Sequence, residues 1–161
     1  MKKAILPALT ICLVVVCSFV TPQQAGMKAS MERGKKVYEA TCLACHQADA
    51  GGVPNMNPPL IKTKWVLGDK KALATIVLKG LKGGEINIDG DTFSNPMPAQ
   101  ETVLTDQQIA DVLTYVRNTF GNKASAVAVA DVTAARLGKK KTAPKAAAPA
   151  RKTTAAPKKK A

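Results

Sequence analysis

Two thiols and one imidazole stand within five consecutive residues of this chain: Cys42, Leu43, Ala44, Cys45 and His46. The two-residue spacing of the cysteines and the adjacent histidine match the attachment signature of c-type haem. In that chemistry each thiol adds to one vinyl group of a porphyrin, and the neighbouring imidazole is held under the iron as its proximal ligand. The motif therefore predicts one covalent haem c, with Cys42 and Cys45 as thioethers and His46 as an iron ligand.

Three other uses of the same residues are weaker. A structural zinc site takes four cysteine or histidine ligands, and beyond the apolar N-terminal segment the chain offers only these three. A thioredoxin-like redox pair opens a helix after a strand, whereas a helix is expected to lead into this motif. A plain disulfide between Cys42 and Cys45 would leave unexplained why His46, the only histidine in the chain, follows at once.

The single histidine also limits what binds the other side of the iron. Ligation by two histidines of one chain is excluded, and a methionine thioether is the common alternative in c-type haems. Met27 and Met31 stand too close upstream of the motif. Met56 follows the motif by only ten residues, whereas Met97 stands between two prolines that stiffen its segment. Met97 is therefore favoured as the distal ligand, and Met56 remains the alternative.

Capping residues and apolar periodicity predict the elements that position these groups. Ser30 can cap a helix through about residue 41 that leads into the motif, and glycines and prolines make 51–59 a loop. A second helix is expected over 70–79 because Asp69 can cap it and Gly80 can end it.

Further along the chain, residues 85–93 alternate in polarity around Asp89 and Gly90, which suits a short β-hairpin. Thr105 opens a capping box, and the helix that follows should end by Gly121. Its expected inward residues are Ile109, Val112, Leu113, Tyr115 and Val116. The predicted fold class is all-α with a small hairpin.

The formal net charge of +13 lies mostly near the C-terminus. Residues 26–121 hold 11 Lys and Arg against 10 Asp and Glu, whereas residues 122–161 hold 11 against one. Residues 122–161 are rich in Lys, Ala and Pro, and a disordered basic tail is expected there. The Ala- and Val-rich stretch 124–137 could form a weak helix within it, and disorder is the expectation from Gly138 onward. Such a tail suits anionic membranes or polymers, and the alternative is a solvated extension without a specific partner. Nucleic acid is not expected as the main partner, because the chain has an export signal.

That signal is the N-terminal order of Lys2 and Lys3, an apolar run over 4–20 and a polar stretch, which is typical of secretory signals. We predict a signal peptide over 1–25 and a periplasmic location. Gln23 stands where a small residue is preferred before cleavage, and an uncleaved membrane anchor therefore stays an alternative. The expected organisation is a signal over 1–25, one domain over 26–121 and a tail over 122–161.

Over residues 30–121 the chain resembles the class I cytochromes c. The matching features, besides the cysteine motif, are Gly34, Tyr38, Pro58-Pro59-Leu60, Asn95-Pro96-Met97-Pro98 and Val112 to Val116. The resemblance implies a small helical fold with the haem in a crevice and helices that cross near Gly34. It also implies that the carbonyl of Pro58 accepts a hydrogen bond from the ring of His46. The implied function is one-electron transfer without catalysis by this chain alone.

Residues 80–97 are also similar to cytochrome domains that accompany periplasmic sugar or alcohol dehydrogenases, through their glycine and methionine spacing. The predicted function is a periplasmic one-electron carrier, between a dehydrogenase donor and an oxidase or other acceptor. The alternatives are a cytochrome subunit of a dehydrogenase complex and a protein that binds anionic polymers through its tail. Trp65 is either a haem neighbour or simply part of the core.

Overall fold

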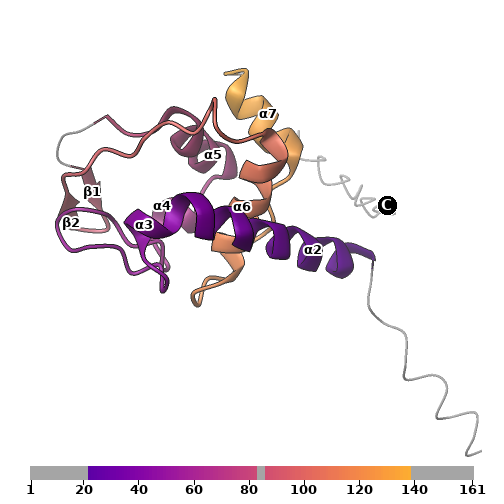
Figure 1. The fold of residues 1–161 in the computed structure, drawn as a ribbon, viewed down its shortest axis with the longest axis horizontal. Helices are drawn as coiled ribbons and strands as arrows, with labels where there is room; N and C mark the ends of the chain where they lie inside the picture. The colour runs from indigo at the N-terminus through magenta and orange to yellow at the C-terminus, as the bar shows by residue number, and fades with distance from the viewer. Residues whose placement is uncertain (1–21, 83–85, 139–161) are drawn as a thin grey trace, which may run out of the picture.

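The computed structural model describes residues 22–82 and 86–138, in which helices dominate (Figure 1). The elements in chain order are α2 (Pro22–Val37), the π-helix η1 (Tyr38–Cys42), α3 (Leu43–His46), α4 (Lys64–Leu67), α5 (Lys70–Lys79), β1 (Ile86–Ile88), β2 (Asp91–Phe93), α6 (Asp106–Asn118) and α7 (Val129–Arg136). The two strands form one small antiparallel sheet. The predicted all-α class with a short hairpin is confirmed.

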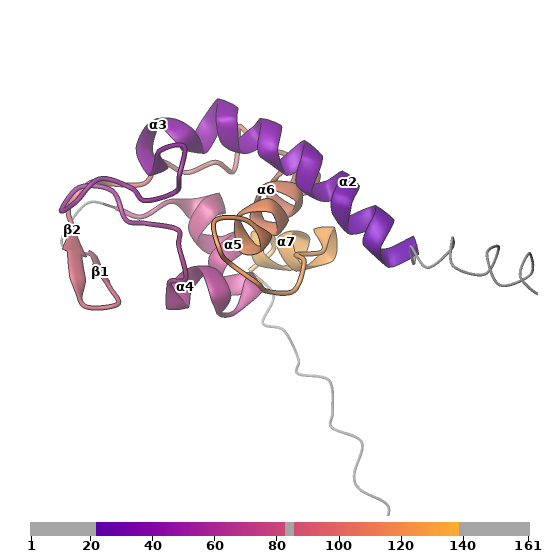
Figure 2. The same ribbon diagram turned by 90° about the horizontal axis from the view of Figure 1, so that it is seen from below.

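Helix α6 is central to the packing. It lies against α2 on one side, with α5 and α7 on its other side (Figure 2). The residues expected to face inward are buried, apart from the partly exposed Tyr115, and they are Ile109, Val112, Leu113 and Val116. This helix therefore joins the N-terminal helix to the rest of the domain.

Helix α2 begins earlier than the sequence predicts. We expected Ser30 to cap the helix, but within the described residues α2 already runs from Pro22 to Val37. Ser30 lies inside the helix instead, and its hydroxyl donates to the carboxylate of Asp111 at 2.5 Å. Most of the expected signal, residues 1–21, lies outside the described part of the chain.

The helical path continues from α2 directly into the cysteine motif. The π-helix η1 follows α2, and α3 ends at His46, after which Gln47 has a φ of 65°. A short π-helix of this kind inserts an extra residue into the helical path and is often found at functional sites. One extra residue turns the following chain by about 100°, and the motif consequently faces a different direction from the surface of α2 that packs on α6.

The crossing of α2 and α6 depends on Gly34, as the resemblance implied. A Cβ on Gly34 would lie 2.1 Å from the carbonyl oxygen of Asp111. Beside this contact the carboxylate of Asp111 accepts bonds from Arg33 at 2.7 and 2.9 Å and from Gln107 at 3.0 Å. Burial alone would raise the pKa of Asp111, but the bonds from Arg33, Ser30 and Gln107 outweigh burial and lower it. The crossing is therefore held by an ionised carboxylate.

The caps predicted for α5 and α6 are present. Asp69 accepts from the amide of Ala72 at 2.7 Å, and Gly80, with a φ of 68°, ends α5. The side chain of Thr105 accepts from the amide of Gln108 at 3.2 Å, and the side chain of Gln108 accepts from the amide of Thr105 at 3.0 Å. The predicted helices therefore form where local hydrogen bonds favour them.

The hairpin also forms as predicted. Ile86 pairs with Phe93 and Ile88 with Asp91. The two turn residues, Asp89 and Gly90, have φ values of 54° and 108°, the positive angles that a two-residue hairpin turn of type I′ requires.

Residues 122–138 were assigned to the tail, with a weak helix possible over 124–137, but they pack onto the domain, and α7 lies within that stretch. Helix α7 contacts α5 and α6, and Val127, Val132 and Ala135 are at most 5% exposed. The amide of Val127 donates to the hydroxyl of Thr114 at 3.0 Å, and Nε of Arg117 donates to the carbonyl of Ser125 at 3.0 Å. The described domain thus continues past the boundary expected at residue 121, and only 139–161 lie beyond it.

Candidate haem site

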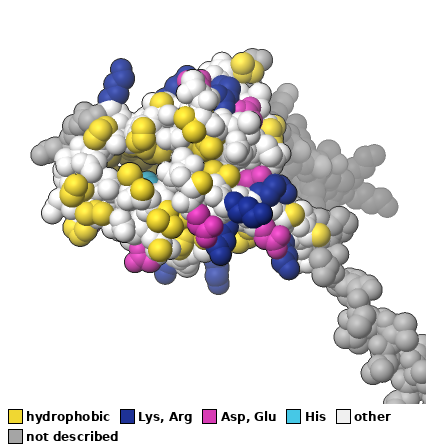
Figure 3. All heavy atoms as spheres, viewed as in Figure 1, with side chains coloured by type: hydrophobic (Ala, Val, Ile, Leu, Met, Phe, Trp, Pro, Cys, Tyr) yellow, Lys and Arg dark blue, Asp and Glu magenta, His cyan; other side chains and the backbone are white. Residues whose placement is uncertain are grey.

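An apolar pocket lies between the cysteine motif and α5. It is lined on one side by the motif with Pro58, Pro59 and Leu60, and on the other by side chains of α5 and of the segment around Met97. The surface is hollowed here, with the histidine at the bottom of the hollow and hydrophobic side chains around it (Figure 3). We call these two sides the proximal wall, which carries His46, and the distal wall, which carries Met97.

The imidazole of His46 is oriented by a backbone carbonyl. Its Nδ1 lies 2.9 Å from the carbonyl oxygen of Pro58, the contact that the resemblance implied. A carbonyl only accepts hydrogen bonds, and Nδ1 must therefore carry the hydrogen. Burial lowers the pKa of His46, and the bond to Pro58 acts in the opposite direction. A neutral ring with a proton on Nδ1 leaves the lone pair of Nε2 free to bind a metal.

The loop that carries Pro58 closes tightly behind His46. The amide of Gly52 donates to the carbonyl of His46 at 3.1 Å, and the amide of Leu60 donates to that of Ala50 at 2.8 Å. Gly52 has a φ of 69°, and a Cβ there would lie 2.3 Å from the carbonyl oxygen of Asn57. This glycine therefore allows the loop to return close enough for Pro58 to reach the imidazole.

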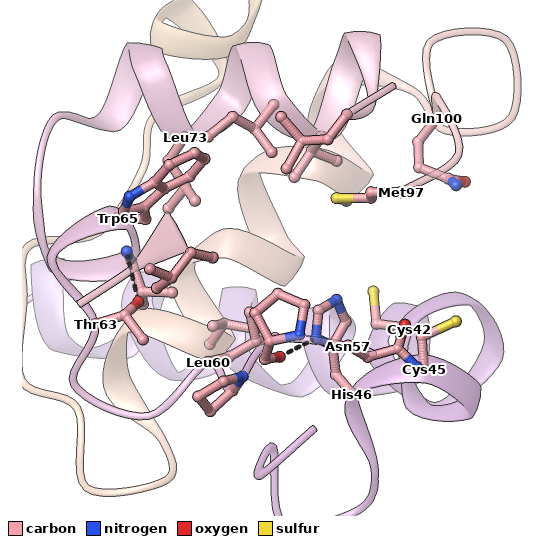
Figure 4. Close-up of a pocket in the computed structure, with 18 of the residues that line it drawn as sticks. Cys42, Cys45, His46, Asn57, Leu60, Thr63, Trp65, Leu73, Met97 and Gln100 are labelled. Atoms are coloured by element: carbon pink, nitrogen blue, oxygen red, sulfur yellow. Dashed lines mark hydrogen bonds between the residues drawn. The ribbon is translucent and has the colours of Figure 1, made fainter. Parts of the chain in front are cut away.

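The two thiols lie beside the imidazole, near one end of the pocket (Figure 4). Cys45 is exposed, whereas Cys42 is partly buried, and neither forms a disulfide. Burial, together with the neighbouring Cys45, raises the pKa of the Cys42 thiol to about 11. Both thiols are therefore free and lie close enough together to add to the vinyl groups of one porphyrin.

Met97 lies on the distal wall, and its sulfur points into the pocket across from His46 (Figure 4). Backbone bonds of 2.9 and 3.0 Å between Met97 and Leu81 hold its segment against the end of α5. Gly80 permits this approach, because a Cβ there would lie 2.3 Å from the carbonyl oxygen of Met97. Met56, the alternative ligand from the sequence, is 47% exposed and does not line the pocket.

The donor set fits a metalloporphyrin better than a bare ion. No group of three or more His, Cys, Asp or Glu side chains able to hold a metal ion occurs in residues 22–82 and 86–138. The pocket instead offers one imidazole nitrogen and one thioether sulfur on opposite walls. A macrocycle that supplies its own equatorial nitrogens needs only these two protein ligands. The residues present therefore fit haem.

Sequence reasoning missed the polar contacts that join the two walls. Nδ2 of Asn95 donates to Oδ1 of Asn57 at 3.1 Å, and the amide of Asn95 donates to the carbonyl of Met56 at 3.0 Å. No local pattern marks these loop residues, because Asn57 and Met56 lie 38 and 39 positions before Asn95 in the sequence. Trp65, which the sequence left undecided, lines the pocket at the end away from the thiols (Figure 4).

A mainly helical fold that brings a haem-attachment motif and a methionine to one apolar pocket defines a c-type cytochrome. Comparison with known families agrees, because the model described as Cytochrome c matches residues 31–120. The chain belongs to the cytochrome c family. Haem c binding and electron transfer follow from this membership.

Individual relatives point to electron carriers and to subunits of dehydrogenases. The chain is 35% identical over 121 residues to the cytochrome c subunit of alcohol dehydrogenase (quinone) from Gluconacetobacter polyoxogenes, which covers 71% of this chain and 25% of that protein. It is 34% identical to the gluconate 2-dehydrogenase cytochrome c subunit from Pantoea cypripedii, over 62% of this chain and 22% of that protein. Cytochrome c-555 from Prosthecochloris aestuarii is 32% identical, over 55% of this chain and 86% of that protein.

The chain therefore spans about a quarter of the length of the two dehydrogenase subunits. It corresponds to most of the length of the small cytochrome c-555.

Proposed function

We propose that this chain is an exported carrier of single electrons, with one haem c attached through Cys42 and Cys45 and its iron bound by His46 and Met97. The observation that carries the proposal is the position of His46 and Met97 on opposite walls of one apolar pocket, while Met56 lies outside it. When bound, the haem supplies an iron that alternates between the ferric and ferrous states. With both axial positions filled by side chains, no site is open for oxygen or peroxide, and catalysis by this chain alone is not expected.

The protein's own residues orient the ligands and exclude water. The carbonyl of Pro58 fixes the ring of His46, and the bridge to Leu81 fixes the backbone of Met97. Apolar side chains such as Leu73 and Leu104, each 7% exposed, line the space between the walls. An apolar surrounding and a thioether ligand both favour a high reduction potential, because they stabilise the less charged ferrous form.

Matched methionine variants test the axial ligation. Oxidised protein should show the weak near-infrared band of iron–methionine bonding, and Met97→Ala should abolish this band. Met56→Ala serves as the control, because the Met56 side chain is exposed outside the pocket. Loss of the band in Met56→Ala, with retention in Met97→Ala, would reverse the assignment.

The covalent attachment has its own test. Haem should remain with the polypeptide after extraction with acidified acetone, and the intact mass should exceed that of the polypeptide by one haem. Cys42→Ala and Cys45→Ala should each leave a single thioether, and the double variant should lose the haem to the solvent. A wild-type mass that equals the bare polypeptide with a disulfide would refute attachment.

A second candidate function is that of a cytochrome subunit in a dehydrogenase complex. The relatives named as cytochrome c subunits of alcohol and gluconate dehydrogenases favour this role. Mixing the haem-loaded chain with a quinone- or flavin-dependent dehydrogenase and its substrate should reduce the haem whether the chain is a subunit of the complex or a separate carrier. Elution of the two proteins as one stable complex supports a subunit, whereas separate elution supports a diffusing carrier.

Location in the periplasm is part of the proposal and rests on the signal-like order of residues 1–25. Within the residues that the structure describes, no helix is long and apolar enough to cross a membrane. The basic residues that remain beyond the packed domain are the nine of 139–161, which contain no Asp or Glu. We propose that this segment strengthens contact with acidic redox partners or anionic membranes. N-terminal sequencing of protein from a periplasmic extract tests the location and the cleavage after Ala25.

A further inference from the structure

The segment that follows Met97 is held at its carbonyls by α7. We call residues 97–104 the methionine loop, which ends at the buried, pocket-lining Leu104. Arg136, the last residue of α7, donates from Nη1 to the carbonyl of Glu101 at 2.7 Å and from Nη2 to the carbonyl of Leu104 at 3.1 Å. One guanidinium therefore binds the methionine loop at two points.

The amide hydrogens of the same loop are bonded elsewhere. Gln100 donates to the carbonyl of Val77 at 3.0 Å, and Glu101 donates to that of Leu78 at 3.2 Å, both in α5. Beyond Met97, whose backbone is bonded to Leu81, the methionine loop is thus held by α5 at two amides and by α7 at two carbonyls. Movement of the loop away from the pocket would break bonds on both sides.

Arg136 is fixed in turn by Asp106, the first residue of α6. Its Nε donates to Oδ1 of Asp106 at 2.7 Å, and the hydroxyl of Thr133 donates to Oδ2 at 2.5 Å. The bond from Thr133, with the bond and charge of Arg136, outweighs burial and lowers the pKa of Asp106. The guanidinium therefore faces an ionised and oriented partner, and charge-assisted bonds of this kind are the stronger ones.

A separate lysine docks the start of α7, whereas Arg136 lies at its end. The ammonium of Lys70 donates to the carbonyl of Ala126 at 2.9 Å and lies 3.6 Å from Oδ2 of Asp131. Lys70 joins α5 to the start of α7, and neither of these two contacts involves the methionine loop. Arg136 and Lys70 are therefore both cations that dock α7, and only Arg136 reaches the methionine loop.

We propose that α7 is a brace for the distal ligand, and that Arg136 is a positioning residue that keeps Met97 at the iron. The proposal rests on the proposed function, in which Met97 is the distal ligand. The brace lies beyond residue 120, where the match to the family ends. Displacement of Met97 by an external ligand requires the methionine loop to move, and the bonds from Arg136 oppose that movement.

Imidazole binding to full-length, haem-loaded protein measures this opposition directly. Imidazole replaces the methionine at the iron, and the change is followed by absorbance and by loss of the near-infrared band. Arg136→Ala should bind imidazole about tenfold more tightly than wild type, which equals about 1.4 kcal/mol. Arg136→Lys should fall between the two, because an ammonium keeps the charge but lacks the planar fork that reaches two carbonyls.

Lys70→Ala is the matched control, because it removes one cation that docks α7 but leaves the methionine loop bonded. Its imidazole affinity should stay within about twofold of wild type. Denaturant unfolding of each variant gives its global stability. Even where the two variants lose a similar amount of stability, Arg136→Ala should raise the imidazole affinity more than Lys70→Ala does. Equal affinities in the two variants would overturn the brace.

The Met97→Ala variant separates this outcome from failure of the proposed function. If Met97→Ala keeps the near-infrared band, the assignment of the distal ligand fails and the brace fails with it. If Met97→Ala loses the band while Arg136→Ala behaves as Lys70→Ala does, only the brace fails. Arg136→Lys carries the comparison if Arg136→Ala does not yield folded protein.

Discussion

Replacing Gly34 with alanine tests whether close contact between α2 and α6 holds the haem domain together. A Cβ at residue 34 would lie 2.1 Å from the carbonyl oxygen of Asp111 and 2.8 Å from Cβ of Tyr115. Because carbon atoms in contact are at least about 3.5 Å apart, the two helices would have to separate by about 1 Å. Both neighbouring atoms belong to α6 itself, and neither can rotate away as a long side chain would.

The expected loss of stability follows from three contributions. Overpacking at such a site costs about 1–3 kcal/mol, and the upper end applies because the clash is with backbone. Separation also stretches the bond from Ser30 to Asp111, now 2.5 Å long, at about 1 kcal/mol. Alanine is a better helix former than glycine by about 1 kcal/mol. The net loss should be about 3 kcal/mol.

Denaturant unfolding of the haem-loaded protein, followed by far-ultraviolet circular dichroism and by haem absorbance, measures this loss. Lys36→Ala is the control in the same helix, because Lys36 is exposed and its replacement should change stability by less than about 0.5 kcal/mol. A loss below about 1 kcal/mol in Gly34→Ala would refute the reasoning, since it would show that α2 and α6 can move apart freely.

Three other outcomes test the remaining contacts. Because the pKa of Asp111 is lowered in the fold, the stability that its charge provides is present above the unfolded pKa and is lost as the pH falls through the folded value. Denaturation measured from pH 7 down to about 2 should show this loss, and Asp111→Asn should be less stable at pH 7 with a flatter acid profile. Asn122→Ala should cost about 3 kcal/mol in denaturant unfolding, at about 1 kcal/mol for each of three hydrogen bonds, and a cost below about 1 kcal/mol would contradict this. Truncation after Gly138 should leave the haem spectrum unchanged and flatten the salt dependence of binding to anionic vesicles, whereas an unchanged salt dependence would deny residues 139–161 an electrostatic role.

Local signals were enough to predict most of the helices. Asp69 and Gly80 bound α5 as expected, since a cap acts through hydrogen bonds to residues within one turn. The start of α2 was predicted wrongly, because serine is a good helix cap by its local chemistry but here uses its hydroxyl for a contact with another helix. Its actual partner, Asp111, is 81 residues away in the sequence, and no local pattern indicates that contact.

The attachment motif could be predicted because covalent chemistry demands a fixed local spacing. The assignment of Met97 as a ligand needed its position in the fold as well as its place in the sequence, since any methionine can also fill a gap in the core. Its place in the pocket supports the assignment, which remains a prediction. Arg136 was missed because a lone arginine in an alanine-rich segment resembles a solvated charge, and its acceptors lie 30 to 35 residues upstream.

The proximal wall is tied to α6 by a residue that we expected outside the domain. Oδ1 of Asn122 accepts from the amide of Lys62 at 2.7 Å, and its Nδ2 donates to the carbonyls of Leu60 at 2.8 Å and Val116 at 2.7 Å. One buried amide thus joins the loop after Pro58 to the last turns of α6.

The distal wall is tied to the opposite end of the same helix, because Arg136 joins the methionine loop to Asp106. Helix α6 has 13 residues, a rigid rod of about 20 Å at 1.5 Å per residue. Loops fixed at the two ends of one rod keep a constant separation, and α6 therefore helps to set the spacing of His46 and Met97, together with the bonds of Met97 to Leu81 and of Asn95 to Asn57. A boundary at residue 121, drawn from the helix stop at Gly121 and from the change in composition and charge after it, consequently divides a unit in which Asn122 and Arg136 supply polar ties to both walls.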